Sequence, residues 1–234
     1  MTLNAPAHKQ ILLQILKDIY SDNSISPFLA FKGGTCAYLF YELDRFSVDL
    51  DFDLLDPEKE DYVFESILKI LRTYGEVKES AKKRFNLFYL LSYDNKKENA
   101  QNVKIEINRR NFGSKYELKS YLGVSMLVMT QDDMFANKLV AMYERIGQTN
   151  RDIFDVYFFF KNNWPMNKNL IEERTGVSYK EFLQKCLTAV EQFNDHYVLD
   201  GLGELLNEKQ KMWVKTKLKS EVIFSLKLAL QNEA

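Results

Sequence analysis

The chain has 234 residues, 46% of them hydrophobic and 14% aromatic, which is ample for a hydrophobic core, so we expect it to fold alone. The charges of its 32 basic and 33 acidic side chains nearly cancel. The chain therefore has no overall positive charge that would attract nucleic acid, although a local basic patch is compatible with this balance. No apolar run approaches the roughly 18 residues that cross a bilayer, and the N-terminus lacks the apolar segment of a signal peptide. We therefore expect a cytoplasmic protein with no membrane partner.

Cysteine and histidine are scarce in this chain. Cys36 and Cys186 lie far apart in sequence, and Cys36 falls within an apolar helical run, which favours buried thiols in a reducing compartment over a disulfide. His8 and His196 are the two histidines. A zinc site is therefore not expected.

The first predicted elements are a helix, a loop and a strand. Apolar residues recur at helical spacing from Ile11 to Ile19, which predicts an amphipathic helix. Serine, asparagine and proline between Ser21 and Pro27 predict a loop, and residues 28–31 then form a short apolar run typical of a buried strand. The chain thus enters its first strand shortly before a pair of glycines.

Gly33 and Gly34 end this strand and begin a short helix that extends to about Phe40. Glycines at such a turn let the backbone approach a ligand closely. The free N–H groups of a new helix and its positive dipole end favour a phosphate. This strand, turn and helix are therefore a candidate phosphate-binding unit.

The next predicted strand covers residues 47–55 and has one apolar and one acidic face. The apolar face carries Val48, Leu50, Phe52 and Leu54, and the polar face carries Ser47, Asp49, Asp51 and Asp53. Neighbouring carboxylates repel one another, and a divalent cation, Mg²⁺ above all, removes this repulsion when the phosphates of a nucleotide complete its ligand shell. The alternative is a solvated edge strand whose charges discourage aggregation. The glycine turn just upstream favours the metal site.

A helix and two more strands follow. The helix opens at Asp56 and ends near Gly75, with a predicted buried stripe of Val63, Ile67, Leu68, Ile70 and Leu71. Residues 84–109 then predict a hairpin-like pair of strands separated by a polar segment. Glu106 lies on the polar face of the second strand, beside Lys104 and Asn108. Taken alone, it is an ordinary exposed residue.

From residue 130 onward the pattern is helical. Residues 130–133 fit a capping box for a helix that reaches Gly147, with Lys138 beside its apolar stripe. Residues 151–160 are apolar around most of a helix, so we expect this helix to be buried in a bundle. Lys138 could pair with Asp152 and Asp155 simply to hold these two helices together, and Arg151 could do the same.

The remaining segments predict further helices. Ser178 caps one of them, residues 199–206 are a plausible loop, and a lysine-rich last helix carries an apolar stripe from Trp213 to Val222. The change from strands to helices near Thr130 is the candidate domain boundary. We place the site in a cleft between the two parts.

These segments resemble a known family. Gly33, Gly34 and Thr35, a helix, and then Arg45, Ser47 and residues 49–52 resemble the first motif of the nucleotidyltransferase fold shared by DNA polymerase beta and kanamycin nucleotidyltransferase. The whole string is similar to the AbiEii/AbiGii family, the nucleotidyltransferase toxins of bacterial abortive-infection and toxin–antitoxin operons. The later pattern, which consists of Asp133, Lys138, Arg145 and residues 151–155, resembles that family's lysine followed by Arg-Asp-x-x-Asp.

The resemblance implies a fold and a set of site residues. The fold is α/β (α+β), with a small mixed sheet in residues 1–129 and a helical bundle in residues 130–234 packed against it. Asp49, Asp51 and Glu106 are the implied ligands of Mg²⁺ or Mn²⁺, and Lys138 is the fourth implied catalytic residue. The implied nucleotide-binding residues are Lys32, Gly33, Gly34, Thr35, Arg45, Ser47, Lys138, Asp152 and Asp155.

The implied function is Mg²⁺-dependent transfer of a nucleoside monophosphate from an NTP to an acceptor. In the family the acceptor is RNA, such as a tRNA 3′ end, or a protein side chain, and the enzyme acts as a toxin encoded beside an antitoxin. One alternative is a small-molecule nucleotidyltransferase of the aminoglycoside-modifying type. Another is a binding module of the same fold that performs no chemistry.

Overall fold

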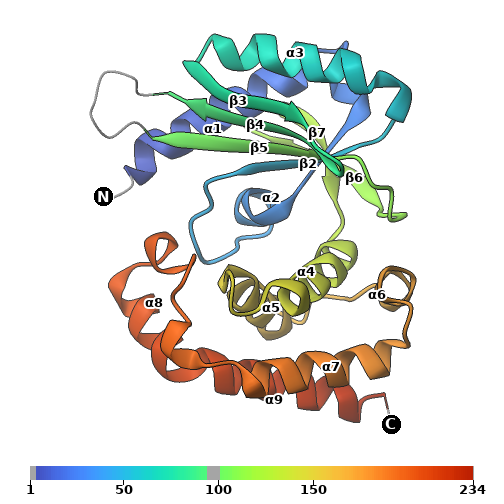
Figure 1. Ribbon diagram of the computed structural model, residues 1–234, viewed down its shortest axis with the longest axis vertical. Coiled ribbons are helices and arrows are strands. Elements are labelled where there is room, and N and C mark those ends of the chain that lie inside the picture. The colour runs from blue at the N-terminus through green and yellow to red at the C-terminus, as the bar shows by residue number, and fades with distance from the viewer. Residues whose placement is uncertain (1–3, 94–100, 234) are drawn as a thin grey trace. The chain divides into compact units, whose positions relative to one another are not determined.

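The computed structural model describes residues 4–93 and 101–233. Contacts within the chain divide it into two compact units (Figure 1). The sheet unit comprises residues 1–111 and 115–129, and the helical unit comprises residues 112–114 and 130–234.

The described part of the sheet unit contains one seven-stranded sheet in the order β3-β4-β5-β2-β1-β7-β6. Its strands are β1 (Leu29–Lys32), β2 (Leu50–Leu54), β3 (Glu76–Lys82), β4 (Asn86–Ser92), β5 (Asn102–Asn108), β6 (Tyr116–Tyr121) and β7 (Val124–Met129). β2 pairs antiparallel with β1 and parallel with β5. The sheet is therefore mixed, as predicted.

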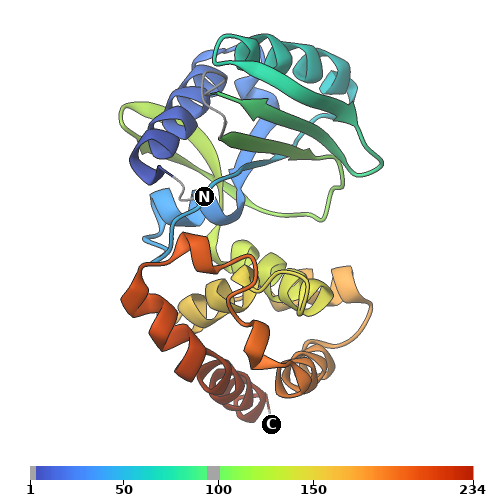
Figure 2. The same cartoon turned by 60° about the vertical axis from the view of Figure 1, so that its left-hand side comes forward.

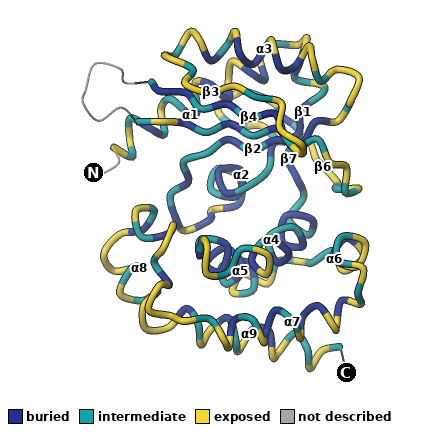
Figure 3. The backbone as a smooth tube through the Cα atoms, in the orientation of Figure 1, coloured by how far each residue is buried: buried dark blue, intermediate teal, exposed yellow. Residues whose placement is uncertain are grey.

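Three helices flank this sheet, namely α1 (Ala5–Ser21), α2 (Gly33–Phe40) and α3 (Glu60–Arg72). α1 and α3 cover one face and α2 lies on the other, as Figures 1 and 2 both show. The core between the sheet and α1 and α3 includes Phe52, whose ring lies 6.2 Å from that of Tyr20, and Tyr89, which stacks on Phe64. Figure 3 shows the buried stretches of these strands in dark blue.

The acidic strand is shorter than the sequence predicts. β2 begins at Leu50, so Ser47, Val48 and Asp49 precede the strand. The carbonyl oxygens of Val48 and Asp49 accept hydrogen bonds from side chains. His8 Nε2 lies 2.9 Å from the Val48 oxygen, and Thr35 Oγ1 donates to the Asp49 oxygen. These bonds tie the backbone before β2 to α1 and α2.

Other differences lie in segments with weak patterns. Three strands, β3, β6 and β7, were not predicted. β3 is mostly exposed and so shows no buried face. β6 and β7 pair antiparallel and are joined by a turn at Leu122 and Gly123. On α3 the buried stripe includes Phe64, whereas Ile70 is only half-buried. The polar segment between β4 and β5 falls largely outside the described residues, but the strands on either side pair antiparallel as predicted.

The helical unit contains α4 (Gln131–Arg145), α5 (Arg151–Lys161), α6 (Lys168–Thr175), α7 (Tyr179–Gln192), α8 (Glu208–Trp213) and α9 (Lys219–Gln231). α4 packs against α5 and α6, and α7 packs along α9. Ser178 caps α7 as predicted, since its side chain accepts a hydrogen bond from the Glu181 amide. The central residues of α5 are buried, which agrees with its apolar circumference.

One prediction in the helical unit is wrong. Thr130 precedes α4, but its hydroxyl makes no capping bond and has no hydrogen-bond partner among the described residues. Asp133, the other half of the predicted capping box, instead accepts a hydrogen bond from Asn167 Nδ2 at 2.6 Å. The predicted last helix is helical throughout, and a π-helical segment at Val214–Leu218 joins α8 to α9.

Both cysteines have free, buried thiols, as expected. Burial raises the pKa of Cys36 well above its ordinary value and that of Cys186 to about 12, so both thiols are protonated at neutral pH. Among helices of the described residues, none combines the length and apolar character that crossing a bilayer requires.

Candidate active site

The glycine turn between β1 and α2 is closely packed against three predicted site residues. Gly33 has a φ of +79°, and a Cβ atom at this position would lie 2.3 Å from Asp51 Oδ2. A Cβ atom on Gly34 would lie 2.9 Å from both Arg45 Nη2 and Ser47 Oγ. The glycines are therefore required here because any side chain would displace Asp51, Arg45 or Ser47.

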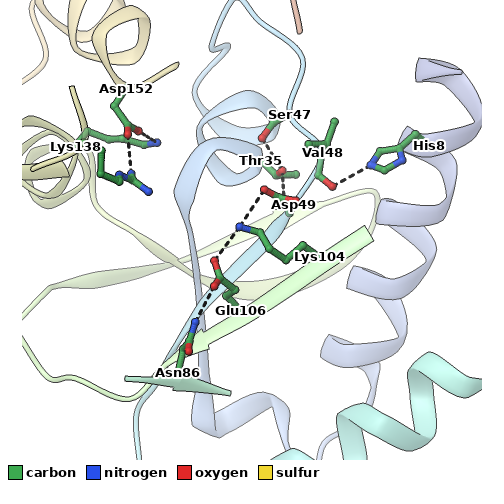
Figure 4. Close-up of polar contacts among 11 residues, drawn as sticks. His8, Thr35, Ser47, Val48, Asp49, Asn86, Lys104, Glu106, Lys138 and Asp152 are labelled. Atoms are coloured by element: carbon green, nitrogen blue, oxygen red, sulfur yellow. Dashed lines mark hydrogen bonds and ion pairs between the residues drawn. The ribbon is translucent and has the colours of Figure 1, made fainter. Parts of the chain in front are cut away.

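Thr35 connects α2 to the segment that carries Asp49. Its buried hydroxyl donates to the Asp49 carbonyl oxygen at 2.5 Å and lies 2.9 Å from Ser47 Oγ (Figure 4). Arg45 is also buried and donates from Nη1 to the Phe46 carbonyl oxygen. These bonds fix the backbone at Asp49, and thus the direction in which its carboxylate leaves the chain.

His8 on α1 holds the same segment. Its Nε2 lies 2.9 Å from the Val48 carbonyl oxygen and its Nδ1 lies 2.8 Å from the Tyr93 hydroxyl. Burial lowers the pKa of His8 from its ordinary 6.5, although the Val48 carbonyl and the Asp49 charge oppose this shift. A neutral imidazole that donates to Val48 therefore tethers α1 to the residue before Asp49.

The predicted carboxylates gather around one lysine. β2 and β5 run parallel, with Asp51 directly beside Glu106. Lys104 Nζ lies 3.0 Å from Glu106 Oε2 and 3.4 Å from Asp49 Oδ2, so its ammonium connects these two side chains (Figure 4). Asn86 Nδ2 donates to the other oxygen of Glu106 at 2.7 Å. The strand register thus unites residues that are more than fifty positions apart in sequence.

The electrostatics of Lys104 reflect this position. Burial alone would lower its pKa, but the charges of Asp49, Asp51 and Glu106 together outweigh burial, and the pKa of Lys104 is raised. All three predicted metal ligands therefore act on the same cationic centre.

Asp53, the third aspartate of the predicted acidic face, belongs to a different cluster. It is buried and lies 2.5 Å from Lys32 Nζ, and it also accepts hydrogen bonds from Asn108 Nδ2 and the Tyr116 hydroxyl. Its charge is thus compensated by the protein. Lys32, a predicted nucleotide-binding residue, bonds Asp53, and its contact with a nucleotide stays a prediction.

In the helical unit, Lys138 joins α4 to α5. Its Nζ lies 2.8 Å from Asp152 Oδ1 and 2.8 Å from Asp155 Oδ2, and both aspartates are fully buried. Arg145 Nη2 lies 2.6 Å from Asp152 Oδ2, an ion-pair distance whose angle does not make a hydrogen bond. These contacts are the ones expected if Lys138 pairs with the aspartates to hold α4 and α5 together. The binding of nucleotide by Lys138, Asp152 and Asp155 stays a prediction.

The donor set of the sheet unit suits a divalent cation. Within residues 4–93 and 101–233, no three His, Cys, Asp or Glu side chains lie close enough to hold a metal ion between them. Asp49, Asp51 and Glu106 nevertheless all attract one cation, the Lys104 ammonium, and their oxygens are the hard ligands that Mg²⁺ and Mn²⁺ prefer. The set therefore fits a divalent metal in ligand type, and two of its members, Asp49 and Glu106, contact the same positive charge.

Sequence reasoning assigned no role to the polar residues that support the carboxylates. It placed Lys104 beside Glu106 on the same strand face but did not predict their contact. Asn86 and His8 could not be identified in this way, because their partners come from distant segments. Arg145 was part of the predicted pattern but had no assigned role.

The chain also matches known proteins in sequence and fold. Residues 14–218 match the profile of one family, described as nucleotidyl transferase AbiEii toxin, type IV TA system. A search of curated protein sequences finds no match.

Three solved structures share the fold. A Helicobacter pylori protein assigned as a nucleotidyltransferase has a TM-score of 0.69 and 23% identity, covering 99% of this chain and 97% of that one. JHP933 from Helicobacter pylori has a TM-score of 0.62 and 21% identity, with coverages of 99% and 94%. MenT4, a nucleotidyltransferase toxin from Mycobacterium tuberculosis, has a TM-score of 0.61 and 17% identity, with coverages of 93% and 82%. The predicted fold is confirmed.

Proposed function

Since this chain belongs to the AbiEii nucleotidyl transferase toxin family of type IV toxin–antitoxin systems, we propose that it transfers a nucleoside monophosphate from an NTP to an acceptor hydroxyl. In this reaction the acceptor oxygen forms a bond to the α-phosphorus, the bond from that phosphorus to the bridging oxygen breaks, and pyrophosphate leaves. The acceptor's proton passes to solvent or to a base. The single observation that carries the proposal is the strand register that places Asp51 beside Glu106, whose carboxylate shares the Lys104 ammonium with Asp49.

The residues of the sheet unit would have separate roles in this reaction. Asp49, Asp51 and Glu106 would hold the divalent cation, and the backbone N–H groups of Gly33 and Gly34 would bind the triphosphate. When bound, Mg²⁺ or Mn²⁺ would lower the pKa of the acceptor hydroxyl and stabilise the negative charge of the leaving pyrophosphate. The surrounding hydrogen bonds then keep the carboxylates in place without rearrangement during the reaction.

Thr35 has a supporting part in this proposal. Its hydroxyl donates to the Asp49 carbonyl oxygen, so it orients a carboxylate, while its predicted contact with the triphosphate stays untested. Ser47 lies beside it, and Arg45 is buried next to Gly34. We therefore assign these three residues to holding Asp49 and the turn in position.

For the acceptor, we propose RNA, with a tRNA 3′ end as the first to test. The sequence offers the adjacent arginines 109 and 110 and the lysine-rich C-terminal segment. In the structure, however, Arg109 Nε donates to Glu60 at 2.7 Å, so this arginine is engaged within the sheet unit. Lys211 likewise pairs with Glu208 at 2.7 Å, so the lysines at 209, 215 and 217 stay the basic candidates for phosphate contacts.

A transfer assay tests the proposed chemistry. Asp49→Asn and Asp51→Asn each remove a ligand charge and almost no volume, so we expect folded proteins whose transfer of label from NTP to bulk RNA is abolished. Asp56→Asn is a matched control, because Asp56 caps the turn before α3 outside the carboxylate cluster and asparagine caps equally well. Transfer by both single mutants at the wild-type rate would refute the proposal.

A growth assay tests the toxin activity. Family membership implies a cognate antitoxin, and expression of the wild-type chain without it should arrest growth. Expression of Asp51→Asn at the same level should be tolerated, because its carboxylate set is incomplete. Harmless expression of the wild type would argue for a housekeeping enzyme or the small-molecule alternative.

A further inference from the structure

We propose that Lys104 is a built-in counter-cation, which a divalent metal ion must displace from Asp49 and Glu106, and that Lys104 thereby sets the affinity of the site for metal. This inference rests on the proposed function, because it takes these carboxylates as the metal ligands. It adds to the site a residue whose effect opposes metal binding.

The position of Lys104 is fixed by the sheet. Its neighbours Val103 and Ile105 are buried on one face of β5, so the Lys104 side chain leaves from the other face, on which Glu106 also lies. From there its ammonium reaches Glu106 Oε2 at 3.0 Å and Asp49 Oδ2 at 3.4 Å. The contact thus follows from the position of Lys104 on β5.

The surroundings make this ion pair effective. The side chains of Lys104, Asp49 and Glu106 are 28%, 15% and 30% exposed, so all three are partly shielded from water. Charges interact more strongly in such a site than on an open surface.

A metal ion and the ammonium compete for the same oxygens. Mg²⁺ binds carboxylate oxygens at about 2.0–2.1 Å, and a metal ion held by Asp49 and Glu106 would take the place of the Lys104 ammonium, which lies 3.4 Å from Asp49 Oδ2 and 3.0 Å from Glu106 Oε2. Two positive charges so close together repel each other. The flexible four-carbon stem lets the ammonium swing toward solvent, while Asn86 holds the other oxygen of Glu106 and preserves its orientation.

Competition predicts an unusual result for a charge-removing substitution. Lys104→Met keeps most of the stem and removes the ammonium. In MnCl₂ titrations of the full chain by calorimetry, we expect its Kd for Mn²⁺ to be at least about tenfold lower than that of the wild type. In EDTA its melting temperature should be lower, since the carboxylates have lost their counter-ion, and Mn²⁺ should raise it more than in the wild type.

Two further variants separate charge from packing. Lys104→Arg keeps the charge and should bind Mn²⁺ with an affinity close to that of the wild type. Lys82→Met removes another lysine of the same sheet, which pairs with exposed Asp61, and should leave Mn²⁺ affinity unchanged. If Lys104→Arg bound Mn²⁺ as tightly as Lys104→Met, charge would not be the cause and the inference would be refuted.

The outcomes also distinguish this inference from the proposed function. If the wild type binds Mn²⁺, Asp51→Asn does not, and Lys104→Met binds no more tightly than the wild type, the metal site stands and the role of Lys104 is refuted. If neither the wild type nor Lys104→Met binds Mn²⁺, the metal site itself is refuted and the inference with it. Tight binding by Lys104→Met alone would support both.

Discussion

Each unit of this protein contains a lysine that contacts two carboxylates, yet the two arrangements differ in accessibility. Lys138 in the helical unit contacts Asp152 and Asp155, whose side chains are 0% exposed. Lys104 in the sheet unit contacts Asp49 and Glu106, and Glu106 is 30% exposed. Similar contacts therefore occur in one cluster whose carboxylates are fully buried and in one cluster whose carboxylates are partly exposed.

The two clusters also differ in composition. Lys138 shares Asp152 with Arg145, so two carboxylates and two cationic side chains form a balanced group between α4 and α5. Lys104 is attracted by three carboxylates. A sealed, balanced cluster is typical of a structural ion pair, whereas an accessible group of carboxylates is typical of a ligand-binding site. The pattern of a lysine beside aspartates does not by itself distinguish these roles.

The largest effect that this comparison predicts is on stability, in the helical unit. Lys138→Met leaves Asp155 and Asp152 buried without the ammonium that bridges them. Removing one partner of a buried ion pair costs about 3–5 kcal/mol, so we expect the free energy of unfolding, measured by urea denaturation, to fall by that amount. Lys227→Met, which breaks an exposed pair with Glu191, should change it by no more than about 0.5 kcal/mol.

The same variant addresses the predicted contact of Lys138 with nucleotide. If Lys138 only pairs with aspartates, NTP affinity in the folded fraction should equal that of the wild type. If Lys138 also binds the triphosphate, affinity should fall by about 1–3 kcal/mol. An unchanged free energy of unfolding would contradict the structural role and remove the distinction between the two clusters.

Much of the sheet unit could be predicted because its signals are local. Alternation along residues 102–108 and the run before Gly33 indicate strands, and the glycines indicate the turn. The pairing of Asp51 with Glu106 could not be predicted from spacing alone, since it depends on how β2 and β5 align. The family resemblance supplied that link.

Other features depend on contacts that no local pattern contains. Asp53 has the same alternation as Asp51, but its neighbours Lys32, Asn108 and Tyr116 make it a buried structural residue. β3 was missed because a mostly exposed edge strand shows no buried face. Sequence periodicity thus assigns a face to each side chain but cannot say what else lies on that face.

A substitution in the glycine turn tests the accessible cluster with a smaller effect on stability. Gly33→Ala places a Cβ atom 2.3 Å from Asp51 Oδ2 at a φ of +79°, so it strains the backbone and displaces a predicted metal ligand. We expect a loss of about 1–3 kcal/mol in the free energy of unfolding, together with loss of Mn²⁺ binding in calorimetry.

Gly123→Ala is the matched control for this strain. Gly123 has a φ of +80° in the turn between β6 and β7, and a Cβ atom there would contact nothing within 4 Å. This variant should lose about 1–2 kcal/mol of stability and keep wild-type Mn²⁺ affinity. Normal metal binding by Gly33→Ala would show that Asp51 is not held by the turn as described.

The smallest predicted effect is a pH dependence that originates at His8, next to the accessible cluster. Mainly through burial, the pKa of folded His8 lies below its ordinary 6.5, which is the value expected in the unfolded chain. Above pH 6.5 both states are neutral, and the contribution to stability is fully present. As the pH falls below 6.5, the unfolded chain takes up a proton that the folded chain resists, so stability decreases.

The slope from one such group is at most about 1.4 kcal/mol per pH unit, and it should be measurable by urea denaturation between pH 7 and pH 5.5. His8→Gln should remove this slope and lower stability at pH 7, because the bond to the Val48 carbonyl oxygen is lost or weakened. His196→Gln removes an exposed histidine and should keep the slope. A slope that persisted in His8→Gln and vanished in His196→Gln would assign the pH dependence to the helical unit and separate it from the carboxylate cluster.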